Sequence, residues 1–177
     1  MAPRIACLVL ILTATVVPAA ASAPCDMNPA GPAQRVFAQE DSKHAWAEFR
    51  NIESVPSLDL ESGISAEVWN EADVAILVRT VQPGEDFWIY TEYCFAENGP
   101  LVYCDLEVRT AWGWGYHTGG PIADGRFHSA NERFFDTKKN QSIPKPHDAD
   151  DISDSLRPTI YADTGRLPFW ELIEKGK

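Results

Sequence analysis

The chain has 177 residues and a formal net charge of −11, with 26 acidic residues against 15 lysines and arginines. Because phosphate binding needs clustered cations to displace counterions, this balance disfavours nucleic acid and anionic membrane surfaces as partners. A basic partner is electrostatically favoured instead.

The N-terminus has the three-part layout of a secretory signal peptide, which we place at residues 1–21. Arg4 precedes an apolar run, and Ala19 and Ala21 satisfy the small-x-small cleavage rule. The apolar run is too short to span a bilayer, so no membrane span is expected. Cleavage leaves 177 − 21 = 156 residues, enough for one domain. The predicted location is secreted or periplasmic.

The residues that follow the signal peptide predict a leader and then a single domain. Residues 22–34 are rich in Pro and Ala with no apolar period, which is typical of a flexible leader. Residues 35–177 then form one β-rich domain. Within 40–53 we expect a helix with Ala45 and Phe49 on one face, although two-residue alternation there also fits a strand.

From residue 64 the apolar pattern changes to a period of two, with turn residues about every ten positions. This indicates a mainly β fold, an antiparallel sandwich or barrel-like domain with one or two short helices. The strands are expected in the segments ISAEVWN (64–70), VAILVRTV (74–81), FWIYTEYCF (87–95) and LVYCDLEVRT (101–110).

The end of the chain predicts a last strand and an amphipathic tail. TIYAD (159–163) has the composition of a strand, and RLPFWELIEK (166–175) places Pro168 at a first helical position. Phe169 and Trp170 are too apolar to remain in water. We expect the tail to dock on the domain, with contact to a partner as the alternative.

The turn ENGP suggests a register for the two strands around it. A three-residue loop pairs Glu97 with Leu101, whereas a two-residue loop would need a backbone N–H that proline lacks. The same register pairs Cys94 with Cys104, which predicts a disulfide between them in an exported protein. Cys25 is then left without a partner.

This register also places Glu92 beside Leu106 on the apolar face. Burial without a partner would raise the pKa of Glu92. A functional acid is one interpretation, because perturbed carboxyls gather at active sites. A salt bridge to an arginine, or a position near the rim of the sheet, is the alternative.

The segment AWGWGYHTGG (111–120) places three aromatic rings on the same apolar face, with glycines that we expect to bend the chain. Packing in the core is the first expectation, since large rings dominate cores. Past the bend, the rings would instead stand at a rim and contact a partner or a sugar. The candidate binding residues are Trp112, Trp114, Tyr116 and His117, together with Phe169 and Trp170.

No metal site, cofactor or catalytic residue is predicted. His117, Asp124 and His128 have no compact zinc spacing, and the acidic run near residue 150 lacks the order of an EF-hand. GxSxG, HExxH, GxGxxG and the Walker lysine loop are absent from the sequence. Asn140 fits an N-glycosylation sequon.

These observations favour an exported acidic binding protein that engages another protein as an inhibitor, an immunity-type protein or an accessory protein. One alternative is a glycan-binding module that uses the aromatic strip. A second is a hydrolase whose acid, base or nucleophile comes from Glu92, His117, Asp124 or His128, which requires these groups to converge in one cleft.

Overall fold

A computed structural model describes most of the chain from residue 25 onward. The described residues are 25, 27, 29, 31–41, 43–55, 63–71, 74–97 and 99–175. The predicted signal peptide lies outside these residues, and the predicted leader lies only partly within them. In the described residues, no helix has both the length and the apolar character needed to cross a membrane.

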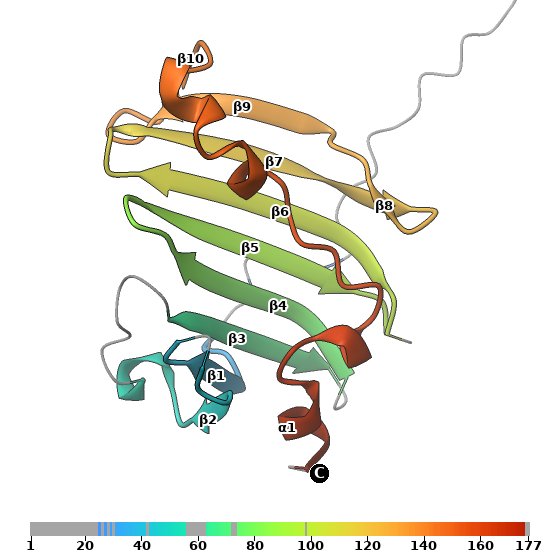
Figure 1. Cartoon of the computed structure of the whole chain (residues 1–177). Helices are drawn as coiled ribbons and strands as arrows, with labels where there is room; N and C mark the ends of the chain where they lie inside the picture. The colour runs from blue at the N-terminus through green and yellow to red at the C-terminus, as the bar shows by residue number, and fades with distance from the viewer. Residues whose placement is uncertain are drawn as a thin grey trace, which may run out of the picture.

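The expected mainly β fold with antiparallel strands is confirmed (Figure 1). Ten strands form one sheet in the order β10-β9-β7-β6-β5-β4-β3-β1-β2, and β8 pairs with β7. Their bounds are β1 Arg35–Gln39, β2 Ala47–Phe49, β3 Ile64–Glu71, β4 Val74–Pro83, β5 Phe87–Phe95, β6 Leu101–Thr110, β7 Trp114–Ala123, β8 Arg126–Phe127, β9 Asn131–Asp136 and β10 Ser142–Ile143.

The helical elements in the described residues are short. Two predictions about secondary structure are wrong. The helix expected within 40–53 is wrong: this segment holds β2, which pairs with β1, followed by a 3-10 turn. The strand expected at 159–163 is also wrong, because only Asp163 forms a β-bridge there. The helical elements are the 3-10 turns Ile52–Ser54, His147–Asp150, Ser153–Leu156 and Thr164–Arg166 and the helix α1 Trp170–Lys175.

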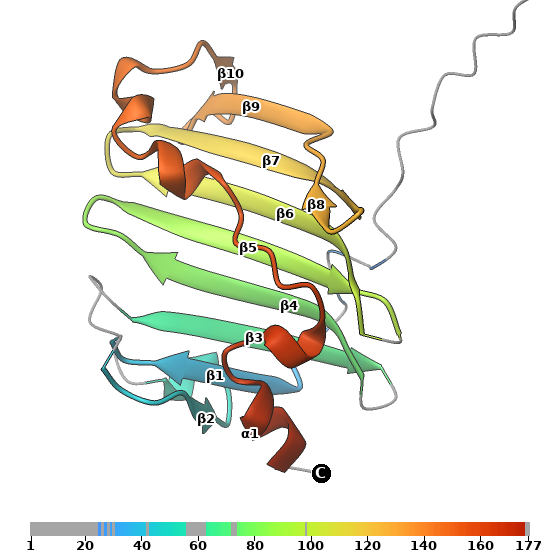
Figure 2. The same ribbon diagram turned by 45° about the vertical axis from the view of Figure 1, so that its right-hand side comes forward.

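The two faces of the sheet have different surroundings. The C-terminal segment, residues 144–175, runs from the β9–β10 edge across one face and ends with α1 near β1 and β3 (Figures 1 and 2). We call this the inner face and the opposite one the outer face. Because side chains alternate along a strand, Leu106 and Val108 are buried on the inner face while Asp105 and Glu107 point outward.

Two clusters of buried side chains form the core. The first joins β1, β3, β4, β5 and the start of β6 to the tail, where Phe37 and Phe169 stack with their ring centroids 4.9 Å apart. The second joins β6 and β7 to the residues around Ala149. Phe169 and Ile173 are 1% and 2% exposed, so the expected docking of the tail on the domain is confirmed.

The register between β5 and β6 differs by one residue from the predicted one. Tyr93 lies opposite Cys104, Cys94 lies opposite Tyr103, and a bulge follows so that Phe95 lies opposite Leu101. A shift of one residue moves side chains to opposite faces. Cys94 therefore points outward while Cys104 points inward.

The predicted Cys94–Cys104 disulfide is wrong for this reason. Cys94 is bonded to Cys25, with the two Cα atoms 5.8 Å apart, and Cys104 is a buried free thiol. Two hydrogen bonds hold the end of the hairpin: Ala96 N–H donates to the Pro100 carbonyl at 2.8 Å, and Leu101 N–H donates to the Ala162 carbonyl of the C-terminal segment at 3.0 Å. The hydrogen bond to Ala162 cannot be inferred from the residues of the ENGP turn alone.

Candidate functional site

The outer face carries a row of charged side chains across four neighbouring strands. Glu67 of β3 lies opposite Arg79 of β4, which lies opposite Glu92 of β5. Glu92 in turn lies opposite Asp105 of β6. We call these four residues the ionic row. Their alignment follows from the strand register, because directly opposed residues in adjacent strands share one face.

Arg79 is held in place by two contacts. Its Nη2 lies 2.6 Å from Glu92 Oε1, and its guanidinium carbon lies 5.1 Å from the centre of the Trp69 ring. The salt bridge to an arginine, one of the alternatives for Glu92, is confirmed. The expected position of Glu92 beside Leu106 is wrong, since the shifted register turns Glu92 to the outer face.

Glu92 and Asp105 are like charges directly opposite each other, an arrangement that destabilises a sheet. Burial raises the pKa of Glu92, and the charges of Asp105 and Glu107 raise it further. Arg79 acts in the other direction but does not offset these effects. The ionic row therefore holds negative charge that its own arginine does not fully compensate.

His117 of β7 contacts the last acid of the row. Its Nε2 lies 3.0 Å from both carboxylate oxygens of Asp105. This hydrogen bond raises the pKa of His117, while burial and nearby Arg133 lower it. Gly119 lies opposite Asp105, and a Cβ atom at Gly119 would collide with the Asp105 carboxylate. The missing side chain at position 119 thus leaves room for the His117–Asp105 pair.

Together these side chains line a shallow groove of about 500 Å³ on the outer face. The groove contains four carboxylates and two guanidinium groups, so its formal charge is negative. Such a surface is suited to holding a cationic side chain. The lining residues are Glu67, Arg79, Val81, Tyr90, Glu92, Asp105, Glu107 and Arg109.

The aromatic candidates do not form a row of exposed rings. Trp114 and Tyr116 are 4% and 5% exposed and belong to the second core cluster, as the first expectation had it. The Tyr116 hydroxyl donates to Glu132 Oε1 at 2.7 Å. Trp112, in the turn before β7, is 44% exposed. The chain reverses at this turn, where Gly113 has a φ of 94°.

The two aromatic candidates in the tail lie at the edge of the first core cluster. Phe169 is 1% exposed, and Trp170 is half-buried and packs against the same cluster. Both rings therefore contribute to the docking of the tail.

The four residues considered for hydrolysis do not come together. Glu92 and His117 both neighbour Asp105, but Asp124 lies in the turn after β7, roughly 20 Å from His117 at about 3.3 Å per residue. His128 is exposed next to β8. Among the described residues, no group of three or more His, Cys, Asp and Glu side chains is placed to hold a metal ion.

Sequence reasoning missed Arg79 and Asp105. The alternation of Asp105, Glu107 and Arg109 with apolar residues was visible, and it places them on a polar face. Their alignment with Arg79 and Glu92 follows only from the correct register. A comparison of the chain with protein families, with curated proteins and with solved structures found no match in any of the three.

Proposed function

We propose that this chain is an exported binding protein that engages a basic partner protein through the outer face of its sheet. The observation that carries the proposal is the direct opposition of Glu92 and Asp105, next to Glu107. A lysine or arginine of a partner placed over these carboxylates would relieve their repulsion. Two unit charges 4 Å apart near a protein surface attract by about 4 kcal/mol before the cost of desolvation.

The charge of the whole chain supports the same proposal. A net charge of −11 attracts a basic protein over long range and speeds the encounter. The ionic row then provides a local match for cationic side chains. Because salt screens exposed charges beyond about 10 Å at 0.1 M, the on-rate should fall as ionic strength rises.

Export of the protein remains part of the proposal. The signal-like N-terminus supports it, and so does the Cys25–Cys94 disulfide, since disulfides persist mainly in oxidising compartments.

The test is affinity capture on the immobilised chain, followed by binding kinetics with each captured protein. The wild-type chain and a variant that carries Glu92→Gln, Asp105→Asn and Glu107→Gln are exposed to the same native exported fraction. We expect the wild type to retain a basic protein that the triple variant loses. The on-rate of that protein should fall steeply with added salt.

A second triple variant controls for net charge. Glu40→Gln, Glu53→Gln and Glu85→Gln remove the same number of charges at exposed positions outside the groove. This control should retain the partner. Equal retention by all three proteins, or a complex whose on-rate is indifferent to salt, would show that the ionic row is not the binding surface.

A further inference from the structure

The middle of the inner face is polar, although the C-terminal segment covers it. Thr80 of β4 lies opposite Thr91 of β5, and the same cross-strand row continues with Ala66 on one side and Leu106 on the other. Gln82 follows Thr80 on the same face and is exposed. A covered face is normally apolar, because buried polar groups need partners. The two threonines instead interrupt the core.

The interruption coincides with a cavity between the sheet and the C-terminal segment. The cavity has a volume of about 430 Å³, within the range of about 300–1,000 Å³ that is usual for small-molecule sites. It is bordered by members of both core clusters, among them Phe169 of the first and Leu106 of the second. Part of the boundary between the two core clusters is therefore this cavity and is not filled by side chains.

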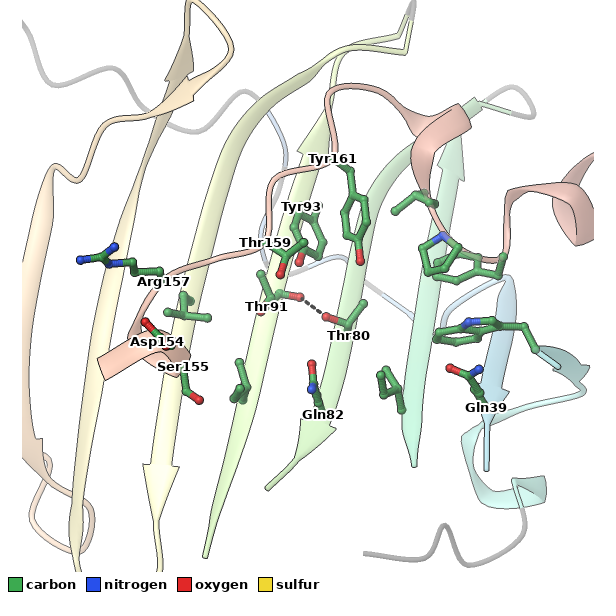
Figure 3. Close-up of a pocket in the computed structure, with 17 residues that line it drawn as sticks. Gln39, Thr80, Gln82, Thr91, Tyr93, Asp154, Ser155, Arg157, Thr159 and Tyr161 are labelled. Carbon is green, nitrogen blue, oxygen red and sulfur yellow. Dashed lines mark hydrogen bonds between the residues drawn. The ribbon is translucent and has the colours of Figure 1, made fainter. Parts of the chain in front are cut away.

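Hydroxyl groups from both walls face this cavity. Figure 3 shows Thr80 and Thr91 on the strands, with Thr159 and Tyr161 approaching them from the C-terminal segment. Thr80 Oγ1 donates to the Thr91 carbonyl at 3.5 Å, the long limit for a hydrogen bond. Within the described part of the chain, the hydroxyls of Thr159 and Tyr161 make no side-chain hydrogen bond. Burial raises the pKa of Tyr161, so this hydroxyl is neutral.

A hydroxyl group both donates and accepts hydrogen bonds, so this arrangement matches a ligand that does the same. The charged side chains at the cavity are Asp154 and Arg157, which have opposite signs and are exposed on the C-terminal segment. The lining therefore has no net charge, which favours a neutral ligand. Trp46, which is half-buried and packs against Phe169, adds aromatic surface that suits the C–H face of a sugar ring.

We propose that this cavity binds a small neutral polyhydroxylated molecule, the size of a mono- or disaccharide, between Thr80 and Thr91 of the sheet and Thr159 and Tyr161 of the C-terminal segment. An aliphatic ligand would make no hydrogen bond to these hydroxyls, whereas a site built of hydrogen-bonding groups favours ligands that pair with them. The site is independent of the ionic row, because it lies on the other face of the sheet.

The test titrates the folded chain with neutral sugars: glucose, galactose, mannose, N-acetylglucosamine, maltose and cellobiose. Binding is followed by amide chemical shifts and by calorimetry. We expect at least one sugar to give saturable shifts at millimolar concentration, centred on Thr80, Thr91 and Tyr161. Thr91→Val keeps the shape and removes the hydroxyl, and Tyr161→Phe does the same, so each should weaken binding about tenfold.

A matched control variant tests whether the loss of sugar affinity is specific to hydroxyls that line the cavity. Tyr90→Phe removes a hydroxyl from the neighbouring residue of β5, which faces outward, and should leave sugar affinity unchanged. Thermal unfolding confirms that each variant is folded. The proposal is overturned if no sugar in the panel binds, if Thr91→Val and Tyr161→Phe bind as tightly as wild type, or if decanol binds at these residues while sugars do not.

Discussion

Cys25 and Cys94 form a disulfide that ties the N-terminal segment to the outer face of β5. Close by, Trp69 Nε1 donates to the Gly31 carbonyl at 3.2 Å. Cys25 and Gly31 therefore contact one end of the outer face, where Trp69, Leu77 and Cys94 are buried. The ionic row lies beyond this end.

Removing the disulfide should strongly destabilise the fold. The two cysteines are 69 residues apart, and the chain-entropy model gives roughly 4 kcal/mol for a loop of this length. Cys25→Ala should lower the free energy of unfolding by about 2–4 kcal/mol in urea titrations. Cys104→Ala keeps the disulfide and should cost about 1 kcal/mol. Equal costs for the two variants, or a Cys94–Cys104 peptide in non-reducing mass spectrometry, would contradict the pairing.

The tail should contribute to stability through Phe169. This ring is 1% exposed and stacks on Phe37, so Phe169→Ala removes a large buried side chain. The expected cost is about 3–5 kcal/mol. Trp112 is larger but 44% exposed, and Trp112→Ala should cost less than about 1 kcal/mol. If thermal unfolding gives similar losses for both, the tail does not dock as described.

Two adjacent glycines of β7 should differ in their tolerance of a methyl group. A Cβ at Gly120 would collide with the backbone carbonyl of His128, which the sheet holds in place. Gly120→Ala should therefore cost about 3 kcal/mol. At Gly119 the obstacle is the carboxylate of Asp105, a side chain able to rotate, so Gly119→Ala should cost about 1 kcal/mol. Chemical denaturation of the two variants checks the order.

The contact between His117 and Asp105 should make stability depend on pH. Because the folded-state pKa of His117 is raised, its contribution is fully present below the unfolded value of about 6.5 and is lost as pH rises through the folded value. NMR titration of the His117 ring should give this raised pKa. In Asp105→Asn it should fall toward the ordinary value, and the stability change over this pH range should flatten. A ring that titrates identically in both proteins would exclude the coupling.

The same substitution should lower the pKa of Glu92. Asp105 raises that pKa through like-charge repulsion, in addition to the effect of burial. Carbon-detected NMR of the Glu92 carboxyl in wild type and Asp105→Asn measures the difference. If the pKa does not change, burial and Glu107 account for it, and the repulsion between Glu92 and Asp105 on which the proposed partner binding rests is absent.

The sequence by itself determined the strands of the central sheet. The two-residue period from Ile64 to Thr110 is a local property, because successive side chains of a strand point to opposite faces whatever the partner strand is. The apolar tail around Phe169 likewise had to be buried. Both predictions needed no knowledge of distant contacts.

Tertiary structure alone decided the register and, with it, the site. The Leu101 N–H donates a hydrogen bond to the Ala162 carbonyl of the C-terminal segment, and the residues of the turn ENGP do not predict this contact. The shift of one residue turned Glu92 outward to Asp105 and Cys94 toward Cys25, because a period of two converts any odd shift into a change of face. The hydroxyl-lined cavity likewise exists only where the C-terminal segment crosses the sheet.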